Sequence, residues 1–486
     1  MIASSLMYLL PELFLTLGSM GLLLYSVLRR QLSVINTVNI AAILLLFTIG
    51  ILLPSSTHTV SLFSGQLSND IFSQYLKIAI LVCSVLVLMS TRSTLYSDHI
   101  YQSEYPVLII LSLIGMMIMV SSTGYLSLFM GLELQSLSLY IITALKRDDG
   151  RSSEAAIKYF ALGALSTGML LYGISFVYGL TGSLIYADTM QFLASQHSSN
   201  LPMYVAFAFI LAGVIFKISA VPFHMWTPDV YEGTPTSITT FLATVPKIAA
   251  FGMIIRLLVG PFAGIAMNWT MIVMVISILS MSLGAFAALN QKSIKRLIAY
   301  SAVGNAGYAL IGLIAGGQSG AQATLIYVLL YVVATLGFFT CLANLYRRGF
   351  PCENINDLAG INRIYPGTAF FMTFLLFSMA GIPPLAGFLG KLYIFNEAIK
   401  SGHHVLAIIG VLTSVISAAY YLWLIKVIMM DPIDTHKWQG TEGYKRDAAA
   451  TLIILVIAAA LTLFFIKPSL FIPLASEAAA SLFAGQ

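Results

Sequence analysis

The 486-residue chain is 59% hydrophobic and 9% charged, with a mean hydropathy of +0.91 and a net charge of +5. Soluble domains average about 25% charged residues, so this composition excludes a soluble enzyme. It is typical of an all-α, polytopic protein that forms one integral membrane domain. Its three cysteines form no CxxC or Cys/His cluster, and no GxGxxG or Walker loop occurs. We therefore expect no metal, haem, iron–sulfur or nucleotide site on this chain.

Fourteen apolar stretches are long enough to form membrane-spanning helices, because a helix needs about 20 apolar residues to cross a bilayer. In chain order they are residues 7–28, 35–54, 74–91, 105–122, 124–145, 154–180, 203–229, 235–258, 268–289, 296–316, 321–346, 366–399, 404–429 and 448–470. The sequence thus predicts about 14 transmembrane helices.

Basic residues are concentrated in alternate loops. Sixteen of the 24 Lys and Arg follow odd-numbered spans: Arg29, Arg30, Arg92, Lys146, Arg147, Arg151, Lys292, Lys295, Arg296, Arg347, Arg348, Arg363, Lys426, Lys437, Lys445 and Arg446. The longest opposite loops, 55–73 and 181–202, contain neither Lys nor Arg. The positive-inside rule places the basic side in the cytoplasm and both termini on the outer side. We interpret Lys77, Arg256 and Lys295 as residues at or near span edges.

The seventh and eighth spans contain lysines beside helix-breaking residues. Lys217 precedes the break made by Pro222 and His224, and Lys247 follows Pro246. An ionisable group at membrane depth is costly, so it usually marks a function. The acidic counterpart is Glu133, about 12 Å into the fifth span at 1.5 Å per residue.

The twelfth span is also interrupted. A straight helix over residues 366–399 would be about 50 Å long, but Pro383 and Pro384 break it, and Lys391 follows. Residues 216–222 match residues 377–383 at an offset of 161. Paired interrupted segments are typical of transporters built from inverted repeats. We therefore predict two inverted five-helix repeats, at 105–258 and 268–429, preceded by three spans at 7–91 and followed by one at 448–470.

Other polar residues leave alternatives open. Lys158 could join the relay or could extend to the cytoplasmic face. His224 could titrate or could cap polar backbone at the break. Asp229 and Glu232 fit a turn before the eighth span. A set of buried lysines with one glutamate, here Lys217, Lys247, Lys391 and Glu133, suits a proton relay, because burial and neighbouring charge both change how firmly such a group holds its proton.

Several long stretches closely resemble the antiporter-like membrane subunits of respiratory complex I. They are G-L-E-L-Q-S-L-S-L-Y (131–140), E-A-A-I-K-Y-F-A-L-G-A (154–164), K-I-S-A-V-P-F-H-M-W-T-P-D-V-Y-E-G-T-P (217–235), F-L-A-T-V-P-K-I-A-A-F (241–251), Q-K-S-I-K-R-L-I-A-Y-S (291–301) and the break at 378–393. The resemblance covers residues 120–430 well.

This resemblance implies a fourteen-helix fold with broken helices 7 and 12. It implies a bacterial inner-membrane protein that pumps protons while quinone is reduced by other subunits of an NADH:quinone oxidoreductase. Glu133 and Lys217 would form the coupling pair, Lys247 the central relay and Lys391 the outer relay. Flavin and iron–sulfur clusters would belong to partner subunits. Membrane lipid and sibling antiporter-like subunits would be neighbours, and no nucleic acid would bind.

Two other functions stay open from the sequence. One is a cation/proton antiporter subunit that works without redox chemistry. The other is a passive assembly scaffold whose buried lysines serve only structure.

Overall fold

The computed structural model of the chain describes residues 7–29, 33–53, 59–195, 201–347, 350–433 and 447–483. The longer helices are α2 (Leu10–Leu28), α3 (Val34–Leu52), α4 (Ile71–Thr91), α6 (Tyr105–Ser121), α7 (Tyr125–Thr143), α8 (Gly150–Thr181), α10 (Leu201–Ile218), α13 (Val245–Val259), α14 (Ala266–Leu289), α15 (Ile294–Ala315), α16 (Gly317–Ala343), α17 (Pro366–Ala380), α18 (Ala386–Lys400), α19 (His404–Met429) and α21 (Ala448–Ile466).

Shorter elements connect these helices. They are α5 (Thr94–Ser97), α9 (Tyr186–Ser195), α11 (Trp226–Gly233), α12 (Thr236–Leu242), α22 (Ile472–Phe483), the 3₁₀ helices Ala263–Ile265, Ile355–Leu358, Ile361–Arg363 and Pro468–Leu470, and the strands β1 (Val60–Leu62), β2 (Leu67–Asn69), β3 (Tyr346–Arg347) and β4 (Phe350–Pro351). Strand β1 pairs antiparallel with β2, and β3 with β4. The fold is therefore all-α apart from two small hairpins in loops.

Every predicted span lies on helical structure. Twelve helical segments of the described residues are long and apolar enough to cross a membrane. The two other predicted spans are α6, which has only 17 residues, and the pair α17 and α18, which is divided at Gly381. The polytopic all-α prediction is confirmed, while the number of crossings and the inverted repeats stay predictions.

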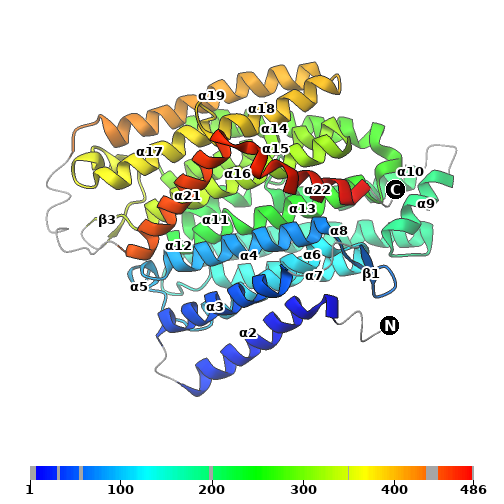
Figure 1. Cartoon of the computed structure of the whole chain (residues 1–486), viewed down its shortest axis with the longest axis horizontal. Coiled ribbons are helices and arrows are strands. Elements are labelled where there is room, and N and C mark those ends of the chain that lie inside the picture. The colour runs from blue at the N-terminus through cyan, green and yellow to red at the C-terminus, as the bar shows by residue number, and fades with distance from the viewer. Residues whose placement is uncertain are drawn as a thin grey trace.

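The helices lie side by side in one bundle (Figure 1). Helices α2 and α3 lie at one edge and α19 lies at the other, with α13, α15 and α16 between them. In the most apolar window of α15, 94% of the residues are buried, against 33% in α2. The centre of the bundle is therefore shielded by protein on all sides, and this is where the candidate site residues gather.

Local sequence explains where several helices begin. The Asp70 side chain accepts a hydrogen bond from the Ser73 backbone N–H at the start of α4, and the Ser73 hydroxyl accepts one from the Asp70 backbone N–H. Such a capping box satisfies two backbone donors that would otherwise lack partners. Ser293 caps α15 in a similar way. Helix α8 ends at Gly182, whose φ of +69° suits glycine.

Helix α22 was not predicted. The apolar final span at 448–470 is shorter in the structure, where α21 ends at Ile466, and a separate helix follows across α16 and α4. The Phe72 backbone N–H donates to the Ser481 hydroxyl at 3.1 Å, which fixes α22 to the start of α4. A twelve-residue helix is too short to register as a span.

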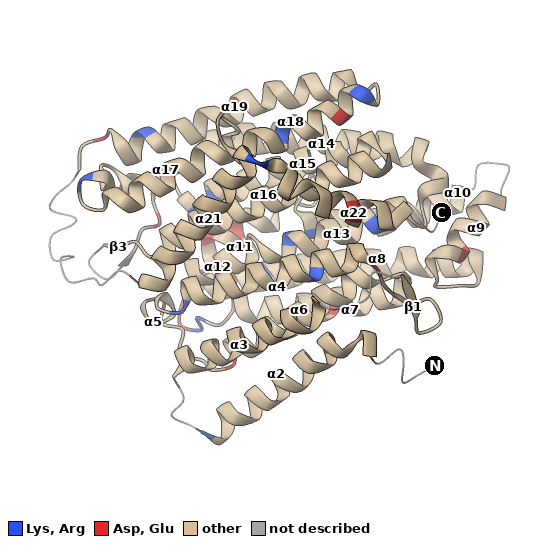
Figure 2. Ribbon diagram, viewed as in Figure 1, with Lys and Arg blue, Asp and Glu red and all other residues tan. Residues whose placement is uncertain are grey.

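Charged residues occur inside the helical body as well as at its ends (Figure 2). Five basic residues that support the predicted orientation lie outside the described residues: Arg30, Arg348, Lys437, Lys445 and Arg446. The sidedness of the chain stays a prediction from loop charge.

Candidate functional site: buried lysines at two helix breaks

The first break separates α10 from α11 over residues 219–225. Ser219 adopts a left-handed conformation with φ of +64°, which ends α10. Two hydrogen bonds hold the irregular backbone: the Val221 N–H donates to the Ser280 hydroxyl at 2.9 Å, and the Trp226 indole N–H donates to the Phe216 carbonyl at 2.9 Å. Non-helical backbone at membrane depth needs such partners within the protein.

Lys247 points into this break from another helix. Its ammonium nitrogen lies 3.0 Å from the Ile218 carbonyl and 2.5 Å from the Ser219 hydroxyl, and the side chain is 3% exposed. The nitrogen also lies 5.6 Å from the centre of the Trp226 ring. The Ile218 carbonyl is available because α10 ends there, so the break itself creates the acceptor.

The eighth span is itself interrupted, which the sequence did not predict. Helix α12 ends at Leu242 and α13 begins at Val245, with Pro246 in its first turn. Proline is favoured there because its missing N–H would have no helical partner. Lys247 therefore lies at the start of a helix rather than within a continuous one.

Lys217 occupies the last turn of α10 and is also buried. Its nitrogen donates to the Ser136 hydroxyl of α7 at 2.7 Å and lies 5.7 Å from the Tyr140 ring. Glu133, on the same helix α7, is half-buried and attracts the Lys217 charge. Within the described residues no ion pair shorter than 4 Å joins them, so they are neighbours without direct contact.

The second break separates α17 from α18, as predicted, at Gly381 with φ of +81°. Lys391 of α18 donates to the Ala380 carbonyl and to the Ser414 hydroxyl, each at 2.8 Å. Its nitrogen lies 5.0 Å from the Tyr308 ring, and the side chain is 6% exposed. The acceptor carbonyl is again the last one of the helix before the break.

A polar network continues from Lys391 into α15. A cavity of about 20 Å³ touches Lys391, Asn305 and Tyr327, which is room for about one water molecule. The Tyr327 hydroxyl donates to the Asn305 side-chain oxygen at 2.6 Å, and the Asn305 amide donates to the Ser301 carbonyl at 2.8 Å. The Ser301 hydroxyl lies 2.5 Å from the Tyr421 hydroxyl. Asn305 within the apolar tenth span was the available sequence signal for this network, and the sequence reading missed it.

Lys158 and His224 are not joined to the buried lysines. Lys158 is 43% exposed and pairs with Glu154 at 2.7 Å and with Asp229 at 2.9 Å. His224 lies half-buried in the first break, near the Pro222 backbone. No hydrogen bond among the described residues joins either side chain to Lys217, Lys247 or Lys391.

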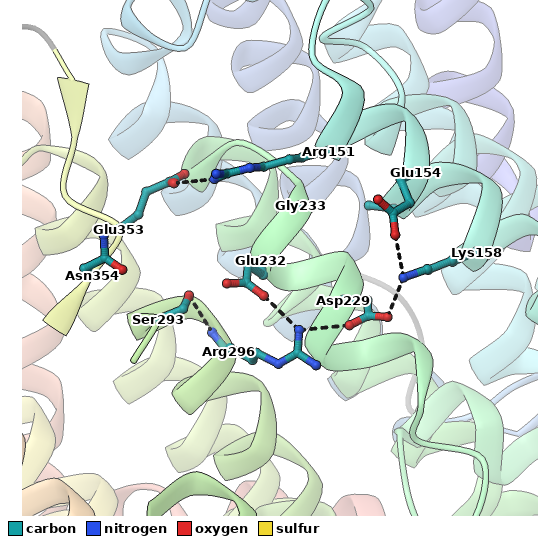
Figure 3. Close-up of a pocket in the computed structure, with 11 residues that line it drawn as sticks. Arg151, Glu154, Lys158, Asp229, Glu232, Gly233, Ser293, Arg296, Glu353 and Asn354 are labelled. Carbon is teal, nitrogen blue, oxygen red and sulfur yellow. Dashed lines mark hydrogen bonds and ion pairs between the residues drawn. The ribbon is translucent and has the colours of Figure 1, made fainter. Parts of the chain in front are cut away.

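Asp229 and Lys158 belong to a charged pocket of about 430 Å³ at one end of the bundle (Figure 3). Arg296 reaches Asp229 at 3.0 Å and Glu232 at 2.9 Å. The interpretation of Asp229 and Glu232 as turn residues was wrong, because both lie within helix α11 and form ion pairs with Lys158 of α8 or Arg296 of α15. The pocket residues are Arg151, Glu154, Ala155, Lys158, Asp229, Glu232, Gly233, Ser293, Arg296, Glu353 and Asn354.

Three cations interpreted as edge residues are buried in the structure. Lys77 pairs with Glu12 at 2.7 Å, joining α4 to α2. Arg256 makes two 2.8 Å bonds to the Asp70 carboxylate. Burial raises the pKa of Asp70, but the Arg256 charge and hydrogen bonds outweigh it and hold this pKa below its usual value. Lys295 is 2% exposed. Arg256 in the last turn of α13 and Lys295 in the first turn of α15 do lie near helix ends. The sequence did not show the burial, because the partners are distant in sequence or in another loop.

The three cysteines are free and buried. Among the described residues, no group of three or more His, Cys, Asp or Glu is placed to hold a metal ion.

Comparison with known proteins places this arrangement in a family. A family pattern described as "NADH:quinone oxidoreductase/Mrp antiporter, TM" matches residues 122–417. The chain is 44% identical over 475 residues to NADH-quinone oxidoreductase subunit N of Methylobacterium nodulans, covering 98% of this chain and 97% of that protein. It is 43% identical over 477 residues to the same subunit of Rhodospirillum rubrum, covering 97% and 96%. The chain belongs to the NADH-quinone oxidoreductase subunit N family.

Solved structures share the fold of this subunit N family member. A chain of respiratory complex I from Thermus thermophilus aligns with a TM-score of 0.80 and 30% identity, covering 96% of this chain and 99% of that one. A chain of the Mrp complex from a Dietzia species aligns with a TM-score of 0.84 at 19% identity, covering 100% and 98%. The second likeness concerns the fold alone. The resemblance to complex I subunits noted in the sequence is thereby confirmed.

Proposed function

We propose that this chain is a proton-translocating membrane subunit of a bacterial NADH:quinone oxidoreductase, and that quinone reduction elsewhere in the complex drives proton transfer through Glu133, Lys217, Lys247 and Lys391. The family assignment supports the complex, since the relatives named above are subunits of that oxidoreductase.

One observation carries the relay: the buried lysines at the breaks face neutral oxygens, whereas the buried cations Lys77 and Arg256 face carboxylates that are buried with them. Lys247 and Lys391 each have one backbone carbonyl and one hydroxyl as acceptors. A neutral amine has two N–H donors, which two acceptors satisfy, and a lone pair that is free to accept a proton. By contrast, Lys77 and Arg256 have a carboxylate within 2.8 Å, which favours permanent charge. The break lysines are therefore suited to exist with and without a proton.

The proposed proton path crosses the membrane from the basic-loop side to the opposite side. A proton enters from the basic-loop side, which we take as the cytoplasm, and reaches Lys247. A change of charge at Glu133 and Lys217 then drives it towards Lys391 and the periplasmic side, where both termini lie. The polar groups Asn305, Tyr327 and Ser301 beside Lys391 support the second half of this route. Lys158 and His224 have no place in it.

A neighbouring membrane subunit covers Glu133. The exposed stripe of α7 contains Leu126, Met130, Leu137 and Ile141, each at least 49% exposed, with the half-buried Glu133 in their midst. A carboxylate at membrane depth faces protein or water rather than lipid. This surface therefore suits a sibling subunit of the complex, and flavin and iron–sulfur clusters would be carried by subunits other than this one.

The experiment is Lys247→Ala in the intact complex, measured in inverted membrane vesicles. We expect assembly and quinone reduction to persist with an uncoupler, while NADH-driven acidification falls about tenfold or more, as for loss of a proton-transfer group. Lys426→Ala is the control, because Lys426 is 58% exposed at the end of α19. Wild-type acidification in an assembled Lys247→Ala complex would contradict the relay.

The alternative of a cation/proton antiporter without redox chemistry draws on the Mrp fold likeness. Purification from native membrane separates the two: an NADH-oxidising arm with flavin and iron–sulfur clusters should accompany the chain in the first case and be absent in the second. A passive scaffold would instead keep pumping after three of the four relay charges are removed.

A further inference from the structure

Lys295 links the charged pocket to the protein interior. It lies in the first turn of α15, and its side chain is 2% exposed. Its nitrogen donates to the Thr234 carbonyl at 2.8 Å and pairs with the Glu353 carboxylate at 3.2 Å. Glu353 lines the pocket and its side chain is 36% exposed. Lys295 thus contacts a solvent-facing carboxylate on one side and the buried loop before α12 on the other.

A row of buried hydroxyls begins at that loop. The Thr234 hydroxyl lies 2.8 Å from the Thr239 hydroxyl. Thr236 and Thr240 lie one turn apart on α12, Thr244 lies in the interruption that follows it, and all five threonines are at most 3% exposed. Short polar side chains of this kind are uncommon in a fully apolar helix core, and they need partners when buried.

The last hydroxyl of the row, on Thr244, lies three residues before the central lysine and donates to the Thr240 carbonyl at 2.6 Å. The Thr244 carbonyl accepts a hydrogen bond from the Lys247 backbone N–H at 3.1 Å, in the interruption between α12 and α13. Helix α12 lies between the Thr234 loop and this interruption. The row therefore covers the distance between the pocket wall and the first break.

We infer that Lys295 is the loading residue of the relay and that the α12 threonines conduct protons from it to Lys247. This inference rests on the proposed function. In the transfer, an N–H bond of Lys295 breaks and an N–H bond forms at Lys247. Each hydroxyl or hydrogen-bonded water between them accepts one proton as it releases another, and Lys295 regains a proton from water in the pocket beside Glu353. No net charge stays on the threonines.

A purely structural role for Lys295 makes a different prediction. In that role the cation simply joins α15 to the Thr234 loop and to Glu353. Arginine would preserve the charge and both partners, but a guanidinium does not release its proton in proteins. Lys295→Arg therefore separates an anchor from a relay, which Lys295→Ala alone does not.

The test compares Lys295→Ala, Lys295→Arg and the control Lys292→Arg in intact complex, in inverted vesicles. Lys292 lies in the loop just before α15 and is exposed. We expect both Lys295 variants to lower NADH-driven acidification about tenfold while uncoupled quinone reduction persists, and the control to equal wild type. Acidification at the wild-type rate in Lys295→Arg would overturn the inference.

A second pair keeps the test decisive if the Lys295 variants do not assemble. Thr239→Val removes the hydroxyl at nearly constant volume, and Thr239→Ser keeps it. We expect Val to slow acidification severalfold and Ser to restore it. Equal acidification rates in the two variants would contradict proton conduction along the threonine hydroxyls. If the Lys295 and Thr239 variants pump normally while Lys247→Ala does not, the inference about Lys295 is wrong and the proposed function stands. If Lys247→Ala also pumps normally, the proposed function itself is wrong.

Discussion

The two helix breaks hold a lysine by the same contacts but bring it there by different chain routes. In each, the amine donates to the last carbonyl before the break, Ile218 or Ala380, and to one serine hydroxyl. Lys391 comes from α18, the helix that directly follows its break. Lys247 comes from α13, which is separated from the first break by α11 and α12. The shared feature is therefore the carbonyl exposed by the broken helix, rather than a shared sequence position.

Aligning the breaks by structure makes this difference sharper. The ends of α10 and α17, and the left-handed residues Ser219 and Gly381, match at an offset of 162 residues, one more than the sequence match suggested. At this offset Asp229 occupies the place of Lys391. Asp229 does not turn to its break but pairs with Lys158 and Arg296 in the charged pocket. The first break therefore needs a lysine from elsewhere, and Lys247 supplies it.

The largest expected effect comes from removing both break lysines. If Lys247 and Lys391 serve one path in series, each single change to Ala lowers NADH-driven acidification about tenfold or more, and the double variant is no worse than the more severe single one. If the two breaks are independent paths, the single losses are smaller and combine in the double variant. Acidification rates of the three variants, normalised to assembled complex, distinguish these outcomes.

The sequence located Lys217, Lys247 and Lys391 correctly as buried residues, because each lies inside an apolar run where charge is conspicuous. It did not locate the carboxylate partners of Lys77 and Arg256, since Glu12 and Asp70 lie near the ends of other segments and pairing depends on how helices pack. The row of threonines along α12 was also missed, because threonine hardly lowers the mean hydropathy of an apolar run.

Some features of the fold were beyond sequence reasoning for a similar reason. The interruption before Lys247 depends on Pro246 being in the first turn of a new helix rather than inside an old one. Both arrangements fit the same apolar run, and tertiary packing decides between them. Helix α22 is apolar but too short for a span, so its position across α16 and α4 follows from tertiary contacts alone.

A smaller effect on pumping, but a clear one on stability, is expected at Arg256. This residue lies on α13 with Lys247, yet its guanidinium donates to Asp70 of the α4 start and to the Val120 carbonyl. Arg256→Ala leaves a buried carboxylate unpaired, which typically costs about 3–5 kcal/mol. We expect a lower midpoint of thermal unfolding in detergent, with pumping per assembled complex largely retained.

The pH dependence checks this assignment of Arg256 to structure. Because the pKa of Asp70 is lowered in the folded state, its stabilising charge is fully present above the usual aspartate pKa of about 4 and is lost as pH falls through the folded value. The stability difference between wild type and Asp70→Asn should thus be constant at neutral pH and shrink only below about pH 4. A difference that changed between pH 6 and 8 would contradict it.

The smallest expected effect comes from Gly381→Ala, which separates backbone strain at the second break from the position of the Lys391 side chain. Gly381 has φ of +81°, and a Cβ there would lie 2.8 Å from the Lys391 Cδ and 3.2 Å from its amine. Gly402 has a similar φ of +84° with open space around it. Alanine at either position costs about 1–2 kcal/mol of backbone strain, but only Gly381→Ala also displaces the lysine. We expect similar losses of thermal stability in both variants and a severalfold loss of acidification in Gly381→Ala alone. Equal acidification in the two would mean that the position of the Lys391 amine against the Ala380 carbonyl does not limit transfer, and the contact that both breaks share would then serve folding rather than pumping.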